Sequence, residues 1–247
     1  MCRMIAAISK KGVKADWILA FEPLAKSGKL RCDMDPKQPG HGDGWGLVAY
    51  LRPHFPEYLD REPHSAVQDP ENFKRGARLI EHEQSPVAIA HFRKISVGKP
   101  AISNTHPFLH GPWAFCHNGT IYESDKIPLK KYTPGGGTDS ERFFLYLVEH
   151  LEESKADLAD PKQVASELKK ILARFKQDFK YSSLTFLLSD GKTIYAYRES
   201  GEKEFDEYYT LYTTQADGGN IVASEPLKKI SSKWEPLPND QLVTLGA

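Results

Sequence analysis

Residues 112–120 of this chain read PWAFCHNGT, and this stretch decides how the rest of the sequence is interpreted. The run at 112–117 predicts a strand, and the Asn-Gly pair that follows favours a tight turn. By itself such a pair indicates no more than an ordinary hairpin. It gains a second meaning from other polar stretches, namely MCR at 1–3, HFR at 91–93 and TDSE at 138–141.

The composition is that of an ordinary globular chain. Of 247 residues, 40% are hydrophobic and 27% are charged, and 33 basic side chains balance 33 acidic ones. A balanced charge creates no overall field that would attract nucleic acid or an anionic membrane. No apolar run is long enough to span a bilayer or to serve as the core of a signal peptide. We therefore expect a cytoplasmic protein that binds neither nucleic acid nor membrane.

The cysteines stand at positions 2, 32 and 116. This odd and sparse set fits neither a disulfide framework nor a metal knuckle. Cys2 differs from the others because methionine aminopeptidases remove Met1 when residue 2 is small. Removal of Met1 would leave a thiol and a free α-amine on the same residue.

The hydrophobic pattern predicts strands first, helices in the middle and strands again at the end. Helices are expected at 14–27, 70–83, 139–151 (with Thr138 and Glu141 as a capping box) and 161–175. Strands are expected at 2–8, 46–51, 87–93, 112–117, 184–188, 193–197, 209–214, 221–223 and 242–245, with 120–123 continuing a hairpin. Residues 35–46 are dense in glycine and proline and predict a loop. Because no linker or repeat interrupts the chain, we expect one domain over residues 1–247.

Five short motifs follow one another along the chain, and their order is informative. They are Cys2 at the start, HFR with a later glycine at 91–98, NTHP at 104–107, HNG at 117–119 and GTDSE at 137–141. In this order the chain resembles the class II glutamine amidotransferases, which are N-terminal-nucleophile hydrolases. The resemblance is closest to the small stand-alone members, in which DGWG (43–46) and ASEPL (223–227) are also familiar. It implies an α+β fold, a four-layer αββα sandwich with two mainly antiparallel sheets between helical layers.

The resemblance implies a catalytic role for Cys2, Asn118 and Gly119. An unmodified α-amine has a pKa of about 7.7–8 and can act as the base for the thiol. Cys2 would attack the γ-carboxamide of glutamine or of a γ-glutamyl compound, release ammonia or an amine, and leave a thioester that water hydrolyses to glutamate. The Asn118 side-chain amide and the Gly119 backbone N–H would form the oxyanion hole. No cofactor and no metal is expected.

A free amino-acid substrate also needs partners for its α-carboxylate and α-ammonium. Arg93 offers a planar fork suited to the carboxylate, and Asp139 offers the charge opposite to the ammonium. Backbone groups around Ser96 and Gly98 would complete the carboxylate site. These charges favour a zwitterion over a simple amide, and His106 is expected to have a structural role.

The chain also departs from the wider family. Larger members carry Arg-Gly before the aspartate of the early glycine loop, where this chain has HGD at 41–43, and residues 94–97 read KISV instead of aromatic-Ala-Thr-His. These differences leave the group on the γ-nitrogen open. Class II amidotransferases usually pass ammonia to an attached synthase domain, which this sequence does not contain. We therefore expect either a separate ammonia-accepting synthase subunit or plain hydrolysis of a γ-glutamyl amide.

Two other classes of function are compatible with parts of the sequence. A metal-dependent hydrolase would draw ligands from His41, Asp43, His91, His106 and His117, but no His-x-His or His-Glu-x-x-His spacing supports it. A non-catalytic subunit would keep the γ-glutamyl pocket without turnover. The joint presence of nucleophile, oxyanion donors and both substrate charges favours the enzyme.

Overall fold

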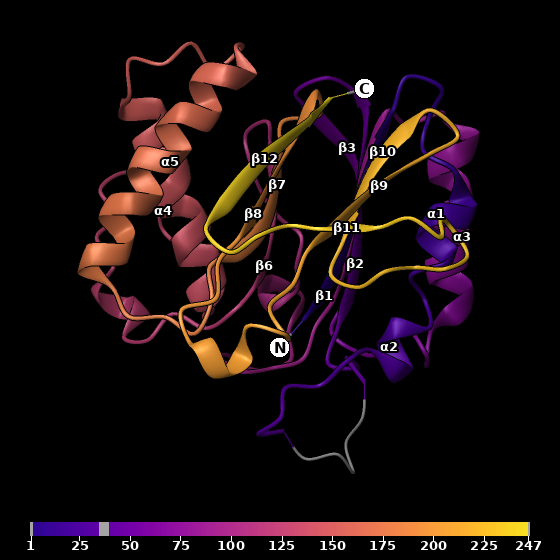
Figure 1. The fold of residues 1–247 in the computed structure, drawn as a ribbon, viewed down its shortest axis with the longest axis horizontal. Coiled ribbons are helices and arrows are strands. Elements are labelled where there is room, and N and C mark those ends of the chain that lie inside the picture. Colours follow the sequence, from indigo (N-terminus) through magenta and orange to yellow (C-terminus); the bar gives the residue numbers. More distant parts are fainter. Residues whose placement is uncertain (1, 35–39, 247) are drawn as a thin grey trace.

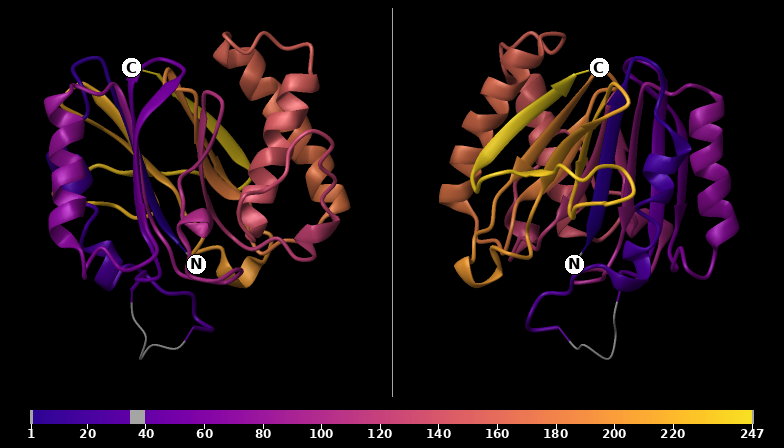
Figure 2. Two further views of the ribbon diagram at one scale, coloured as in Figure 1. Left: turned by 180° about the vertical axis from the view of Figure 1, so that it is seen from behind. Right: turned by 45° about the vertical axis from the view of Figure 1, so that its right-hand side comes forward.

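The computed structural model describes residues 2–34 and 40–246. Within these residues, two antiparallel sheets face each other and helices cover their outer faces (Figure 1). The views from behind and from the side show the same order of layers, helix, sheet, sheet, helix (Figure 2). The four-layer αββα architecture expected from the resemblance is therefore confirmed.

The first sheet has the strand order β11-β9-β10-β1-β4-β2-β3, and its neighbouring strands are antiparallel. Helices α1 and α3 pack together on its outer face (Figure 2). The strands are β1 (Arg3–Ser9), β2 (Trp45–Arg52), β3 (Phe55–Glu62), β4 (Val87–Phe92), β9 (Tyr212–Ala216), β10 (Gly219–Ala223) and β11 (Glu235–Pro236), and the helices are α1 (Ala15–Leu19), α2 (Leu24–Ser27) and α3 (Pro70–His82).

The second sheet has the order β12-β8-β7-β6-β5, and helices α4 and α5 cover it. Its strands are β5 (Phe108–His110), β6 (Trp113–Asn118), β7 (Thr185–Ser189), β8 (Thr193–Arg198) and β12 (Gln241–Gly246), and its helices are α4 (Asp139–Glu153) and α5 (Pro161–Asp178). Short 3-10 helices lie at η1 (Ile102–Asn104), η2 (Ser124–Lys126) and η3 (Lys203–Phe205).

Strand β1 lies in the middle of the molecule and is buried on both faces. Because side chains alternate along a strand, Ile5 and Ala7 pack under the helices, whereas Met4, Ala6 and Ile8 face the other sheet. This double burial explains why the segment reads as one continuous apolar run. It also directs the side chain two positions before Met4, that of Cys2, into the space between the sheets.

Several expectations about local structure need correction. The helix expected over 14–27 is split into α1 and α2, and Pro23, which has no N–H to donate, stands immediately before α2. Residues 120–123 do not continue a hairpin from β6, because β6 pairs with β5 and β7 while Ile121 forms an isolated bridge with Tyr181. Strands β3, β5 and β11 were not expected, and β11 has only 2 residues. β3 is a partly exposed edge strand containing Pro56, and β5 has only 3 residues, so neither carries a clear alternation.

The β-hairpin expected from the strands at 184–188 and 193–197 is confirmed. The hairpin of β7 and β8 turns at Asp190-Gly191, where Gly191 has φ +82°. In the loop expected at 35–46, residues 35–39 lie outside the described residues, and β2 begins at Trp45. No helix in the described part of the chain is long and apolar enough to cross a membrane. The single domain over residues 1–247 stays a prediction, which the core shared by the two sheets supports.

Candidate active site

The two sheets meet at Cys2 and Asn118. Cys2 stands immediately before β1 of the first sheet, and Asn118 ends β6 of the second. The Cys2 backbone N–H donates a hydrogen bond to Asn118 Oδ1 over 2.9 Å. Both residues are buried, with exposed fractions of 7% and 0%. Sheet packing therefore brings together two residues that are 116 positions apart.

The oxygen and the nitrogen of the Asn118 side-chain amide have different surroundings. Its oxygen accepts from Cys2, but its nitrogen Nδ2 is buried and has no hydrogen-bond partner among the described residues. An orphaned buried donor typically costs about 1–3 kcal/mol. A ligand oxygen that accepted from Nδ2 would remove this cost, and this is what a preorganised oxyanion donor requires.

The turn after Asn118 has no room for a side chain. A Cβ on Gly119 would lie 2.0 Å from the Ser183 carbonyl oxygen and 2.6 Å from His117 Nε2. The glycine at this position is thus a requirement of close packing. Its backbone lies directly beside the residue whose amide nitrogen is free.

His117 fixes the end of β6 from the other face. Its Nε2 lies 3.0 Å from the Ser183 carbonyl and its Nδ1 lies 2.9 Å from Ser140 Oγ. A carbonyl only accepts, so Nε2 carries the hydrogen and the Ser140 hydroxyl donates to Nδ1. Burial lowers the pKa of His117, in agreement with this neutral form, although Asp139 opposes the shift. His117 therefore positions the turn and is not placed to exchange protons with a substrate.

Arg93 directly follows β4, and the loop after it wraps around its guanidinium. Nη1 donates to the Lys99 carbonyl at 3.2 Å and Nη2 to the Val97 carbonyl at 2.9 Å. Gly98, with φ +81°, supplies the left-handed turn that this loop needs. Burial lowers the pKa of Arg93, and the largest of the effects that oppose this shift comes from Cys2. A guanidinium has five N–H donors, so the two loop bonds leave donors for a carboxylate.

Asp139 is the first residue of α4, and only 3% of it is exposed. Its Oδ2 accepts from the Ile121 backbone N–H at 2.7 Å, which ties the helix to the segment after the turn at Asn118 and Gly119. Ser96 joins the same region, because its Oγ accepts from the Thr120 hydroxyl at 3.1 Å. The residues singled out from the sequence thus lie at or close to ends of β1, β4, β6 and α4.

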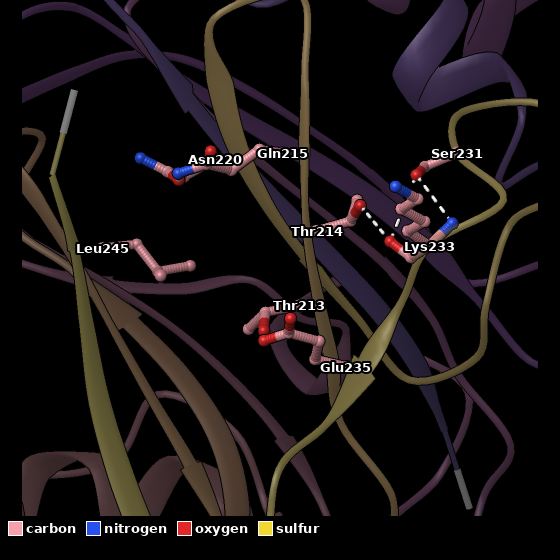
Figure 3. A pocket seen from close by; sticks show the side chains of 8 residues that line it. All are labelled: Thr213, Thr214, Gln215, Asn220, Ser231, Lys233, Glu235 and Leu245. Carbon is pink, nitrogen blue, oxygen red and sulfur yellow. Dashed lines mark hydrogen bonds between the residues drawn. The ribbon is translucent and has the colours of Figure 1, made fainter.

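One cavity lies away from these residues. It has a volume of about 490 Å³ and opens between the edge strands of the two sheets (Figure 3). Mostly polar side chains line it, namely Thr213, Thr214, Gln215, Asn220, Ser231, Lys233, Glu235 and Leu245. None of these residues is among those predicted to act on a substrate. The candidate site is therefore placed at Cys2 and Asn118 and not at this cavity.

The histidines do not assemble a metal centre. Among the described residues, no three His, Cys, Asp or Glu side chains gather as ligands for a metal ion. His91 and His106 are buried and packed ring on ring, with centroids 4.2 Å apart, and His106 also contacts the ring of Phe108. Burial lowers the pKa of both histidines, so both are neutral packing partners near neutral pH.

Sequence reasoning missed one residue next to Cys2. The fully buried Arg3 donates from Nη1 to the Cys2 carbonyl at 2.9 Å. A charged side chain inside an otherwise apolar strand was the available signal, because such a charge needs a partner in the fold. Ser140 and Ser183, which hold His117, carried no comparable signal.

Comparisons with known proteins agree with this geometry. The model of the family "Glutamine amidotransferases class-II" matches residues 1–207. An uncharacterized protein of Methanocaldococcus jannaschii is 28% identical over 227 residues, covering 82% of this chain and 61% of that protein. A protein of Escherichia coli K12 with the name "Putative glutamine amidotransferase YafJ" is 26% identical over 229 residues, which cover 83% of this chain and 86% of that protein.

Among solved structures, a glutamine aminotransferase class-II domain protein of Silicibacter pomeroyi superposes with a TM-score of 0.64. The match covers 100% of this chain and 95% of that chain at 22% identity, and it shows the fold alone. The family model, in contrast, extends over most of the sequence and includes the candidate residues from Cys2 to Asp139. The chain therefore belongs to the class II glutamine amidotransferase family.

Proposed function

We propose that this protein hydrolyses the γ-carboxamide of glutamine or of a γ-glutamyl compound, with Cys2 as the nucleophile after removal of Met1. One observation carries the proposal. The nitrogen of Cys2 is hydrogen-bonded to Asn118 Oδ1, while the Nδ2 of the same amide is buried without a partner. A single side chain thus holds the base and leaves a donor for the oxygen on which charge develops. Met1 itself lies outside the described residues, so its removal stays a prediction.

The proposed reaction has two halves. The α-amine of Cys2 takes the thiol proton, and Sγ attacks the amide carbon. The oxyanion accepts hydrogen bonds from Asn118 Nδ2 and the Gly119 backbone N–H. The tetrahedral intermediate collapses to a thioester, and the leaving nitrogen departs with the proton held by the amine. Water then attacks the thioester with the amine again as the base, releasing glutamate and the free thiol.

The substrate end is proposed to lie between Arg93 and Asp139. Both side chains are buried, they carry opposite charges, and the pKa of Arg93 responds to the charges of Cys2 and Asp139. Arg93 would hold the α-carboxylate together with the backbone around Ser96 and Gly98, and Asp139 would hold the α-ammonium. This arrangement favours a free amino acid or γ-glutamyl compound over a simple amide. The released nitrogen either leaves as ammonia or an amine, or passes to a separate synthase subunit.

Replacement of the nucleophile tests the mechanism. Glutamate release from glutamine and from γ-glutamyl peptides is measured for the wild type, Cys2→Ala and, as a matched control, Cys32→Ala at an exposed cysteine. We expect Cys2→Ala to abolish turnover and still bind glutamine in calorimetry, and Cys32→Ala to behave as the wild type.

Two results would contradict the mechanism. Unchanged turnover in Cys2→Ala would exclude Cys2 as the nucleophile. An intact mass that retains Met1 in fully active protein would exclude the α-amine as the base, since an acylated nitrogen does not accept a proton. A wild type that binds glutamine without turning it over would instead indicate a non-catalytic binding subunit.

A further inference from the structure

We propose that Arg3 is a positioning residue for the nucleophile, which it fixes through the Cys2 carbonyl. The inference rests on the proposed function, because it assigns a role within the same site. Arg3 directly follows Cys2 in the chain and is fully buried.

Arg3 is held on several sides. Its Nε lies 2.6 Å from Glu225 Oε1, and its Nη2 donates to the Lys29 carbonyl. Its guanidinium carbon lies 4.3 Å from the centre of the Tyr208 ring, in the geometry of a cation–π contact. With these contacts made, Nη1 is left in a fixed place, where it donates to the Cys2 carbonyl at 2.9 Å.

An N-terminal nucleophile has a particular need for such an anchor. Once Met1 is removed, no preceding residue restrains Cys2. Asn118 Oδ1 holds the nitrogen on one side of the Cα, and Arg3 holds the carbonyl on the other. Together these bonds fix how the amine faces Sγ. A displacement of 1 Å at such a place can cost about 100-fold in rate.

The anchor also joins segments that are distant in sequence. Glu225 follows β10 closely, and its Oε1 additionally accepts from the Lys29 backbone N–H at 2.7 Å. Lys29 lies just after α2. Three parts of the chain therefore converge on one guanidinium beside Cys2. An arginine suits this position because its planar fork makes several directed bonds at once, whereas an ammonium is a point charge.

The experiment compares Arg3→Lys and Glu225→Gln with the wild type, and uses Arg198→Lys as the matched control. Arg198 is also buried, and it bonds the Tyr209 and Leu237 carbonyls and the Asp206 carboxylate, but not Cys2. We expect Arg3→Lys to lower kcat at least about tenfold because the nucleophile is misplaced. KM should stay near the wild-type value because Arg93 and Asp139 are untouched.

Glu225→Gln is the milder variant, because the amide oxygen can still accept from Lys29. It should lower kcat less than Arg3→Lys, again without a change in KM. Arg198→Lys should lower the melting temperature and keep kcat. Wild-type kcat in folded Arg3→Lys and Glu225→Gln would overturn the proposal, and so would an equal loss of kcat in Arg198→Lys.

Alkylation by iodoacetamide separates this proposal from the proposed function. The rate at Cys2 is followed by peptide mass spectrometry, with the exposed Cys32 as internal reference. If the wild type released no glutamate from any tested compound, the proposed function would fail. Slower alkylation of Cys2, but not of Cys32, in Arg3→Lys and Glu225→Gln would still support the positioning role. Equal rates in the variants and the wild type would overturn it.

Discussion

Asn118 is the residue on which the proposed chemistry depends most directly after Cys2. An amide is suited to the place because it accepts and donates at the same time and does not titrate. Its acceptor is used within the protein, by the Cys2 nitrogen, and its donor is not. The unpartnered Nδ2 is a cost to the free protein that a developing oxyanion would remove.

Removal of this donor should therefore affect kcat more than KM. Asn118→Ala and the isosteric Asn118→Asp should each lower kcat by about 100- to 1,000-fold, as is typical for one oxyanion donor. The aspartate also places a negative charge where one must develop. Steady-state glutamate release is the measurement. Asn220→Ala is the control, because the Asn220 side chain lies near the start of β10 and is hydrogen-bonded to Gln215 and Gly246 instead of to the site. Wild-type kcat in Asn118→Asp would remove Asn118 from the oxyanion hole.

Gly119 offers a steric test of the same turn. In Gly119→Ala the new methyl group would meet the Ser183 carbonyl at 2.0 Å, so the turn must move. We expect a loss of both kcat and melting temperature. Gly246→Ala is the control, since a Cβ there meets nothing within 4 Å. An active and equally stable Gly119→Ala would contradict the requirement for close packing at this turn.

At the scale of elements, the start of α4 carries both a helix-capping residue, Thr138, and a candidate substrate-binding residue, Asp139. Thr138 caps the helix as expected, with its hydroxyl accepting from the Glu141 N–H at 3.2 Å. The Glu141 carboxylate does not complete the capping box. It binds the backbone N–H groups of Gly135 and Gly136 instead. The first turn of α4 thus holds the preceding glycine loop as well as Asp139.

Loss of the cap should therefore have two effects. Thr138→Ala should destabilise the protein by about 1 kcal/mol, as N-cap removals do. It should also raise KM, because Asp139 begins the same helix. Asp160→Ala removes the matching cap of α5, where Oδ1 accepts from the Lys162 N–H, and should lower the melting temperature alone. Melting curves and steady-state kinetics separate the two. An unchanged KM in Thr138→Ala would contradict the expectation that the α4 cap supports substrate binding by Asp139.

At the scale of the whole molecule, buried neutral histidines link stability to pH. Burial lowers the folded-state pKa of His91, His106 and His117. Unfolded histidines titrate at about 6.5, so below this pH the unfolded chain binds more protons than the folded one. Stability is therefore full above about pH 6.5 and is lost as the pH falls, by up to about 1.4 kcal/mol per pH unit and histidine.

Thermal melts should show this loss as the pH falls below about 6.5, and little change between about pH 7.5 and 6.5. His106→Asn should make the melting temperature less dependent on pH, whereas His82→Gln, at a side chain 82% exposed, should leave the dependence unchanged. Glu199, whose pKa is raised by burial, acts in the opposite direction in all variants alike. The same pH dependence in His106→Asn and the wild type would contradict the assignment.

The sequence by itself determined the alternating and continuous apolar runs, and with them most strands and helices, whereas the αββα class was implied by the family resemblance. These signals are local, because the period of burial is written into each segment. It also supplied the order of Cys2, Arg93, Asn118 and Asp139, which carries the family resemblance. It did not reveal β3 and β5, since an exposed edge strand and a strand of 3 residues have too little alternation to register.

Only the tertiary structure decided which polar atoms meet. The bond from Cys2 to Asn118 crosses from one sheet to the other, and no local period encodes a contact between residues 116 positions apart. The same holds for Arg3, whose partners Lys29, Tyr208 and Glu225 lie in separate segments. A charge within an apolar strand shows from sequence that a partner must exist. Only the folded chain settles what that partner is, because burial leaves each polar atom only the neighbours that the fold brings to it.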